Sequence, residues 1–148
     1  TKIITASWDN TIKIWSVDTG NVSKTLDYHT DNVNTAKDSP DGTTSVASSN
    51  DGTTKMITSD GRKLFEFPNE FEDGSFDPVQ FSVFSPDRSK VAITFEYDVE
   101  IWEQDPVETN VYKKGVLSMF NDPAVTRRDK LDGQFAPDQV GRILNQYL

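Results

Sequence analysis

Ser7-Trp8-Asp9-Asn10-Thr11-Ile12-Lys13-Ile14-Trp15 is the stretch of sequence that decides the fold. A polar turn leads into a strand in which Ile12 and Ile14 alternate with polar residues, and the strand ends in Trp15. A second turn, Asp18-Thr19-Gly20, begins the next segment. Weaker copies of this unit occur twice more, at a spacing of roughly forty residues, which predicts a repeat architecture built from strands.

The composition of the chain favours one globular, β-rich protein. The 148 residues are 34% hydrophobic and 11% aromatic, and the formal net charge is −9. An acidic surface repels phosphate backbones and anionic lipids, so we expect neither nucleic acid nor membrane as a partner. The charge is interpreted chiefly as a solvated surface, with steering toward a basic partner as the alternative.

The absence of cysteine excludes disulfides, thiolate zinc sites and a cysteine nucleophile. It fits an intracellular protein, and we expect a cytoplasmic location. The sequence shows neither a signal peptide nor an apolar run of the roughly 18 residues that a membrane span needs. The chain opens without Met inside a predicted strand, residues 2–5, and so we expect a piece of something longer.

Strand and turn signals divide the first part of the chain into three units. The turns Ser39-Pro40-Asp41-Gly42 and Ser85-Pro86-Asp87 lie 46 positions apart and are strong hairpin signals. Val22–Leu26 is grouped with the second unit and Lys63–Phe67 with the third. The other strands are predicted at residues 3–7, 11–17, 32–36, 43–48, 53–58, 79–84, 90–95 and 99–102.

The pattern becomes weaker after residue 105. Residues 110–120 are predicted to hold one or two strands, and residues 121–132 a charged loop. The last dozen residues are predicted to form a short amphipathic helix, because their apolar side chains fall at helical spacing. Those side chains belong to Val140, Ile143, Leu144 and Tyr147.

The repeating unit resembles the WD repeat, whose strands build the four-stranded blades of a β-propeller. The resemblance rests on the strand at residues 10–15 that ends in Trp, the two Ser-Pro-Asp turns and the loop His29-Thr30-Asp31. It covers about three degenerate repeats in residues 1–104, the first incomplete. Residues 105–148 are expected to be a divergent blade or a C-terminal extension. The resemblance implies an all-β protein of antiparallel four-stranded blades.

WD repeats often carry a hydrogen-bond network of His, Ser or Thr, Asp and Trp side chains across a blade. The members implied here are Thr5, Asp9 and Trp15 in the first unit, His29 and Asp51 in the second, and Trp102 in the third. Ala47 and Ile57 replace the hydroxyl residue and the Trp in the second unit, and Glu96 takes the Asp position in the third. Only the first blade is therefore expected to make most of the network.

Three blades do not close a propeller, which needs about four to eight. Three arrangements remain open: part of a longer propeller, a ring assembled from several copies of the chain, or a fourth blade formed by residues 105–148. In the second unit, Lys37 and Asp38 stand where an inward aromatic residue is usual. A charged pair at such a position is costly unless it is exposed or paired.

Candidates for chemistry are few. His29 is the only histidine and is assigned to the blade network rather than to catalysis or metal binding. Carboxylates gather in two groups, one at Glu70, Glu72, Asp73 and Asp77 and the other at Glu96, Asp98 and Glu100. The first group is interpreted as a solvated loop and the second as the solvent-facing side of a strand. We expect no cofactor, no metal and no catalysis.

The function expected from the resemblance is that of a protein-interaction scaffold. Propeller faces bind protein or peptide partners through residues just before the blade Asp and at the start of the inner strand. Those positions are Trp8, Asn32, Asn34, Asn50 and Phe95. Packing of Trp8 against a neighbouring blade is the alternative for that residue. The alternatives for the whole chain are a self-assembling propeller fragment or designed blade set without a partner, and a carboxylate-dependent hydrolase.

Overall fold

The computed structural model describes residues 1–67, 76–96, 99–108 and 111–114. These residues form eleven β-strands and no helix. The strands are β1 (Lys2–Ala6), β2 (Ile12–Ser16), β3 (Val22–Leu26), β4 (Val33–Asp38), β5 (Thr44–Ser49), β6 (Thr54–Thr58), β7 (Lys63–Phe67), β8 (Phe81–Phe84), β9 (Lys90–Thr94), β10 (Val99–Gln104) and β11 (Tyr112–Lys114). The described residues thus contain no helix that could span a membrane.

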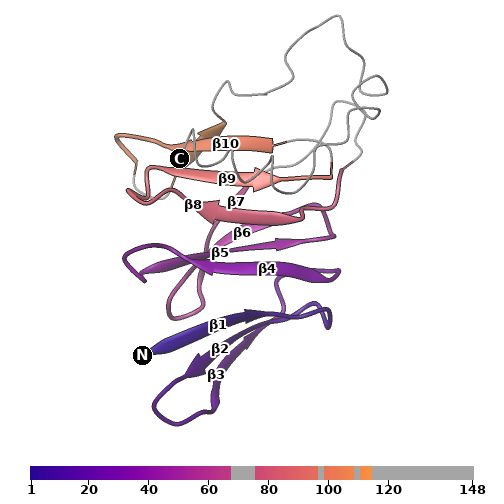
Figure 1. Ribbon diagram of the computed structural model, residues 1–148, viewed down its shortest axis with the longest axis vertical. Coiled ribbons are helices and arrows are strands. Elements are labelled where there is room, and N and C mark those ends of the chain that lie inside the picture. Colours follow the sequence, from indigo (N-terminus) through magenta and orange to yellow (C-terminus); the bar gives the residue numbers. More distant parts are fainter. Residues whose placement is uncertain (68–75, 97–98, 109–110, 115–148) are drawn as a thin grey trace, which may run out of the picture.

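The strands form three antiparallel sheets, in each of which every strand pairs with the next along the chain. The first sheet is β1-β2-β3, the second β4-β5-β6-β7 and the third β8-β9-β10-β11. Figure 1 shows the sheets stacked on one another, with the first sheet at one end of the molecule and the third toward the other. The predicted all-β class is confirmed, and the arrangement is consistent with a partial set of β-propeller blades.

Alternating side chains and capped turns produce these strands. In β2, Ile12 and Ile14 are buried, whereas Lys13 between them faces the other side of the sheet. In the turn between β4 and β5, the Ser39 hydroxyl donates to Asp41 Oδ1 at 2.6 Å, and the Thr43 amide donates to the same oxygen at 3.1 Å. These bonds fix the turn and hence the register of the hairpin.

Two apolar clusters hold the three sheets together. The first lies between the first and second sheets and is built from Ile12, Ile14, Leu26, Val33, Ala47 and Ile57. The second lies between the second and third sheets and includes Val46, Met56, Phe67, Val79, Phe84, Val91, Ile93, Phe95, Trp102 and Tyr112. Phe67 and Trp102 meet edge to face with ring centroids 5.6 Å apart. Neighbouring sheets therefore contact each other through their faces.

Strand pairing follows the same register in the three sheets, so equivalent positions can be compared. Equivalent cross-strand pairs are Ile3–Trp15, Ser45–Ile57 and Val91–Trp102. Ile57 and Trp102 pack against the preceding sheet. The first sheet has three strands, no described sheet precedes it, and Ile3 on this side is 52% exposed. Among the described residues, the first sheet therefore has no strand equivalent to β4 and β8.

The repeat units of the sequence are offset from the sheets by one strand. Val22–Leu26 pairs with β2 and closes the first sheet, and Lys63–Phe67 pairs with β6 and closes the second. The reason is that a hairpin turn joins each of these strands to the strand before it. The third sheet ends with β11, which lies within the segment 110–120 predicted to hold a strand. The predicted C-terminal helix lies outside the described residues.

The charged pair at the end of β4 is exposed and partnered. Asp38 Oδ1 accepts a hydrogen bond from the Ser45 hydroxyl at 2.6 Å. The Lys37 ammonium lies 5.8 Å from the centroid of the Phe81 ring, within the range of a cation–π contact. The structure therefore meets the condition for accommodating charges here, because neither side chain is buried in a core.

Candidate partner-binding face

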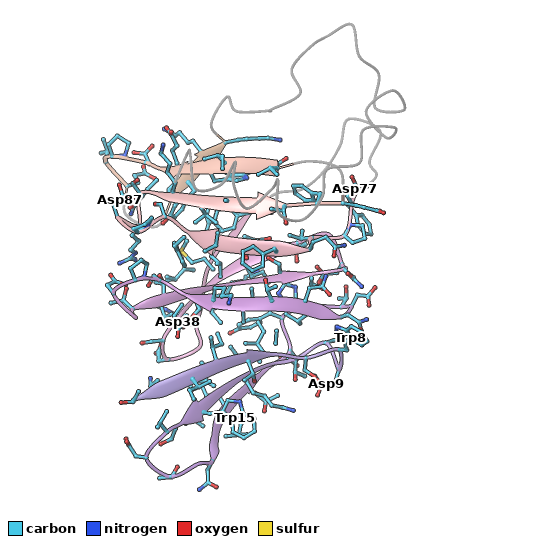
Figure 2. All side chains as sticks on the ribbon, in the orientation of Figure 1. Trp8, Asp9, Trp15, Asp38, Asp77 and Asp87 are labelled. Carbon is cyan, nitrogen blue, oxygen red and sulfur yellow. The ribbon has the colours of Figure 1, made fainter. Side chains whose placement is uncertain are left out.

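One edge of the stack gathers the segments that the sequence assigned to partner binding. We call it the loop face; it consists of the turn 7–11, the loop 27–32, the turn 50–53 and the segment 76–80. Figure 2 shows Trp8, Asp9 and Asp77 at this edge and Asp38 and Asp87 at the opposite one. The loop face thus combines segments that join strands of all three sheets.

Backbone hydrogen bonds connect these segments to one another. The Val33 amide donates to the Ser7 carbonyl at 3.1 Å, which ties the second sheet to the first. The Val79 amide donates to the Ser49 carbonyl at 3.0 Å and ties the third sheet to the second in the same way. The loop face is therefore a continuous, hydrogen-bonded surface, and a partner would meet it largely in its final shape.

Asparagine side chains complete this network. The Asn34 amide donates to Asn50 Oδ1 at 2.7 Å and to the Val79 carbonyl at 2.8 Å, and so joins three segments. The Asn10 amide donates to the Thr30 carbonyl at 3.3 Å, while its own backbone has a φ of 68°. Asn tolerates this left-handed conformation better than most residues. Of the predicted contact residues, Asn34 and Asn50 thus bond to each other, and Asn32 lies in the adjoining loop.

The aromatic residues of the region differ in exposure. Trp8 is 78% exposed at the tip of the turn between β1 and β2. Phe95, predicted as a second anchor, is 7% exposed and belongs to the core between the second and third sheets. Phe76 was missed in the sequence and is 57% exposed. Its position at the end of the acidic segment could have drawn attention to it.

Phe76 lies directly on the turn between β5 and β6. A Cβ built on Gly52 would come within 2.5 Å of the Phe76 ring, and Gly52 has a φ of +80°. Both the close approach and the left-handed backbone require glycine here. Gly52 is therefore what allows an exposed aromatic ring to rest on this part of the loop face.

The first sheet contains part of the predicted side-chain network. Trp15 Nε1 donates to Thr5 Oγ1 at 2.9 Å. Asp9 closes the turn instead: its Oδ1 accepts from the Thr11 hydroxyl at 2.6 Å and from the Thr11 amide at 3.0 Å. These bonds, together with one involving Ser7, hold the pKa of Asp9 well below its usual range. Thr5 and Trp15 are thus brought together, and Asp9 orients the turn that carries Trp8.

The second sheet contains the predicted His–Asp pair. His29 Nδ1 lies 3.0 Å from Asp51 Oδ2, and the His29 side chain is 0% exposed. Burial alone would raise the pKa of Asp51, but hydrogen bonds from His29, Thr53 and the Thr30 amide bring it well below its usual range. Because an ionised carboxylate only accepts, the Nδ1 atom carries the proton of this bond.

The other ring nitrogen of His29 has no hydrogen-bond partner among the described residues. Ala47 stands in β5 at the register position that Thr5 holds in β1, since Ala47 pairs with Lys55 and Thr5 with Lys13. A hydroxyl is therefore absent from the second sheet at the position where the first sheet has one. His29 is thus hydrogen-bonded through Nδ1, whereas Nε2 has no partner among the described residues.

The third sheet replaces the network with a different arrangement. Trp102 Nε1 donates to Glu100 Oε2 at 2.9 Å, and Lys114 forms an ion pair with the same carboxylate. Ile93 occupies the register position of Thr5 and offers no oxygen. Glu100 is 7% exposed, and so its assignment to a solvent-facing side was wrong. The physical reason is that this side of β10 packs on the second sheet, where Trp102 and Lys114 partner the carboxylate.

These side-chain networks are more readily explained as structural than as catalytic or metal-binding groups. Among the described residues no group of three or more His, Cys, Asp or Glu side chains could hold a metal ion. His29 is enclosed, and Glu100 is bound to Trp102 and Lys114. Glu70, Glu72, Asp73 and Asp98, which were considered as carboxylate ligands or catalysts, lie outside the described residues.

Stacked antiparallel sheets whose turns are closed by Asp define a repeat protein made of propeller-type blades. Comparison with known families agrees: residues 1–16 and 20–57 match the family model described as WD domain, G-beta repeat. These segments cover β1, β2 and the strands from β3 to β6. The resemblance to the WD-repeat family is therefore confirmed for residues 1–16 and 20–57. WD40 repeats generally serve as scaffolds for protein–protein interaction.

Proposed function

We propose that this chain is a rigid, non-catalytic interaction module that presents its loop face to a protein or peptide. The observation that carries the proposal is the exposure of Trp8 on a turn fixed by hydrogen bonds to its neighbour. An exposed Trp held in place loses little conformational freedom on binding and can bury a large apolar area. Such residues are frequent binding hot spots.

The other predicted contact residues take different roles in this proposal. Asn34 and Asn50 position the loop face through the hydrogen bond between their side chains. The backbone carbonyl of Asn32 accepts a hydrogen bond from the backbone amide of Asn50. Phe95 supports the surface from within the core. Phe76 joins Trp8 as a contact residue, because both rings are exposed on the same face. A cytoplasmic location is part of the proposal and is supported by the absence of cysteine.

A peptide selection tests the role of Trp8. Random peptides displayed on phage are selected on the whole chain, and their affinities are then measured for Trp8→Ala. Loss of a central Trp contact costs about 2 kcal/mol or more, so we expect affinity to fall at least roughly thirtyfold. Val107→Ala is the matched control, because Val107 is also an exposed apolar residue but lies between β10 and β11.

The proposal fails if no peptide is selected, or if every selected peptide binds Trp8→Ala as well as it binds the original chain. Thermal unfolding of the variant shows whether the fold survives the change. Trp8 is exposed, so its replacement should leave stability nearly unaltered.

A further inference from the structure

We infer that the segment bound on the loop face is basic, and that one of its Lys or Arg side chains lies against the Trp8 indole. This inference rests on the proposed function and adds the chemistry of the partner. It is carried by the charge of the segments that surround Trp8 and by their fixed positions relative to it.

Acidic residues predominate in the segments of the loop face. Its described segments hold five carboxylates and neither Lys nor Arg, and the histidine among them is buried. The carboxylates belong to Asp9, Asp27, Asp31, Asp51 and Asp77. The turns at the opposite edge differ, because they include Arg62 and Arg88, and Arg88 pairs there with Asp41.

Two of these carboxylates differ from the others in being exposed without an ion pair among the described residues. The Asp51 carboxylate is hydrogen-bonded to His29, and Asp9 Oδ2 lies 3.3 Å from Lys13 Nζ. Asp27 and Asp31 are exposed, and in the described part of the chain neither forms an ion pair. Their negative potential is therefore not cancelled locally and extends into solvent over about a Debye length, roughly 8 to 10 Å at physiological salt.

The fold places these carboxylates beside Trp8. The loop 27–32 lies next to the turn that carries Trp8, because the Val33 amide bonds to the Ser7 carbonyl and the Asn10 side chain bonds to the Thr30 carbonyl. A cation drawn toward Asp27 and Asp31 therefore arrives next to an exposed indole.

The indole itself favours the same kind of ligand. The face of a Trp ring carries a negative quadrupole and attracts a Lys or Arg cation by about 0.5–1 kcal/mol at an exposed site. Carboxylates nearby add to this attraction, whereas an acidic segment would be repelled by both. Charge complementarity and the aromatic surface thus select the same partner: a basic peptide segment.

The experiment uses the whole chain and the peptides selected by phage display. We expect Lys and Arg to be enriched over the starting library, and binding to weaken as salt is raised. Asp27→Asn with Asp31→Asn should reduce affinity at least about threefold and flatten the salt dependence. Asp18→Asn is the matched control, since Asp18 is exposed at the opposite edge.

A double-mutant cycle locates the cation. In a selected peptide each Lys is replaced in turn by Met, which keeps the length and removes the charge. For one position the loss should be at least about threefold with the original chain and should shrink with Trp8→Leu, which keeps an apolar side chain without the ring.

The outcomes separate this inference from the proposed function. Selected peptides that lack basic residues and bind independently of salt, yet lose affinity with Trp8→Ala, would overturn the basic partner and leave the interaction module standing. A Lys-to-Met loss that is unchanged in Trp8→Leu would overturn the contact with the indole. Peptides indifferent to Trp8→Ala would contradict both.

Discussion

At the scale of single residues, the second sheet contains a polar atom that is left without a partner. His29 Nε2 is buried and unpaired among the described residues, although Nδ1 is bonded to Asp51. A buried polar group without a hydrogen bond costs about 1–3 kcal/mol. WD repeats often include a Ser or Thr hydroxyl in this network, and Ala47 stands where the first sheet has the Thr5 hydroxyl.

Ala47→Ser should restore that hydroxyl. We expect the free energy of unfolding to rise by about 1 kcal/mol, because Nε2 gains an O–H donor. Urea unfolding measures the change. Ala92→Ser is the control: Ala92 is equally buried in a strand of the third sheet, and the described residues provide no histidine beside it, so this variant should lose stability. A loss of stability in Ala47→Ser as well would contradict the role given to Ala47.

Residue-level assignments show where sequence reasoning reaches its limit. The pairing of His29 with Asp51 could be predicted, since both residues stand at motif positions. The burial of Glu100 could not, because alternation within β10 shows which residues share a side but not which side is covered. Its partner Lys114 lies 14 positions away on another strand, at a distance that no local pattern encodes.

At the scale of elements, the strands were predictable and their grouping into sheets was not. Period-2 alternation and turn residues located the strands to within about two residues, as for β3 and β7. The repeat unit of the sequence begins with the last strand of one sheet and continues into the next sheet, so its boundaries do not show where a sheet ends. A recurrent device at the turns is a carboxylate two residues before a Thr or Ser, as in Asp41–Thr43 and Asp87–Ser89.

These turn carboxylates make stability depend on pH. Hydrogen bonds from Ser85 and Ser89 lower the pKa of Asp87 to about 2 from its ordinary value of 3.8. Because the pKa is lower in the folded state, its contribution is complete above about pH 4 and is lost as the pH falls toward 2. The stability of the original chain should therefore decrease across this interval.

Asp87→Asn isolates that contribution. The variant should be less stable than the original chain at pH 7, and the difference should narrow as the pH falls from about 4 toward 2. Urea unfolding at several pH values measures it, with Asp18→Asn as a control whose carboxylate forms no part of such a turn. A difference that stays constant over the interval would show that the Asp87 charge does not stabilise the turn.

At the scale of the whole molecule, the first sheet has an uncovered side. The side that carries Ile57 in the second sheet and Trp102 in the third is packed against a neighbouring sheet. Its equivalent in the first sheet carries Ile3 and Trp15 and meets no described sheet. An apolar side with this register matches a further blade, and each of the three arrangements that the sequence left open could supply it.

Light scattering over a concentration series measures whether copies supply that blade. We expect the weight-average mass to exceed that of one chain and to rise with concentration. Ile3→Glu should lower it, because a charge at the uncovered side opposes packing. Val107→Glu, at an exposed site elsewhere, is the control. A single-chain mass at every concentration would contradict self-association.

The hydrogen bonds that join Ser7 to Val33 and Ser49 to Val79 have a further consequence. Strand pairing does not cross from one described sheet to the next, so each junction between sheets is a seam held by side chains and these few bonds. A ligand lying across the loop face spans both seams and braces them. By thermodynamic linkage, a substitution that strengthens the contacts between sheets must then also raise the affinity for such a ligand. In this protein, ligand affinity and the stability of the contacts between sheets are therefore expected to change together.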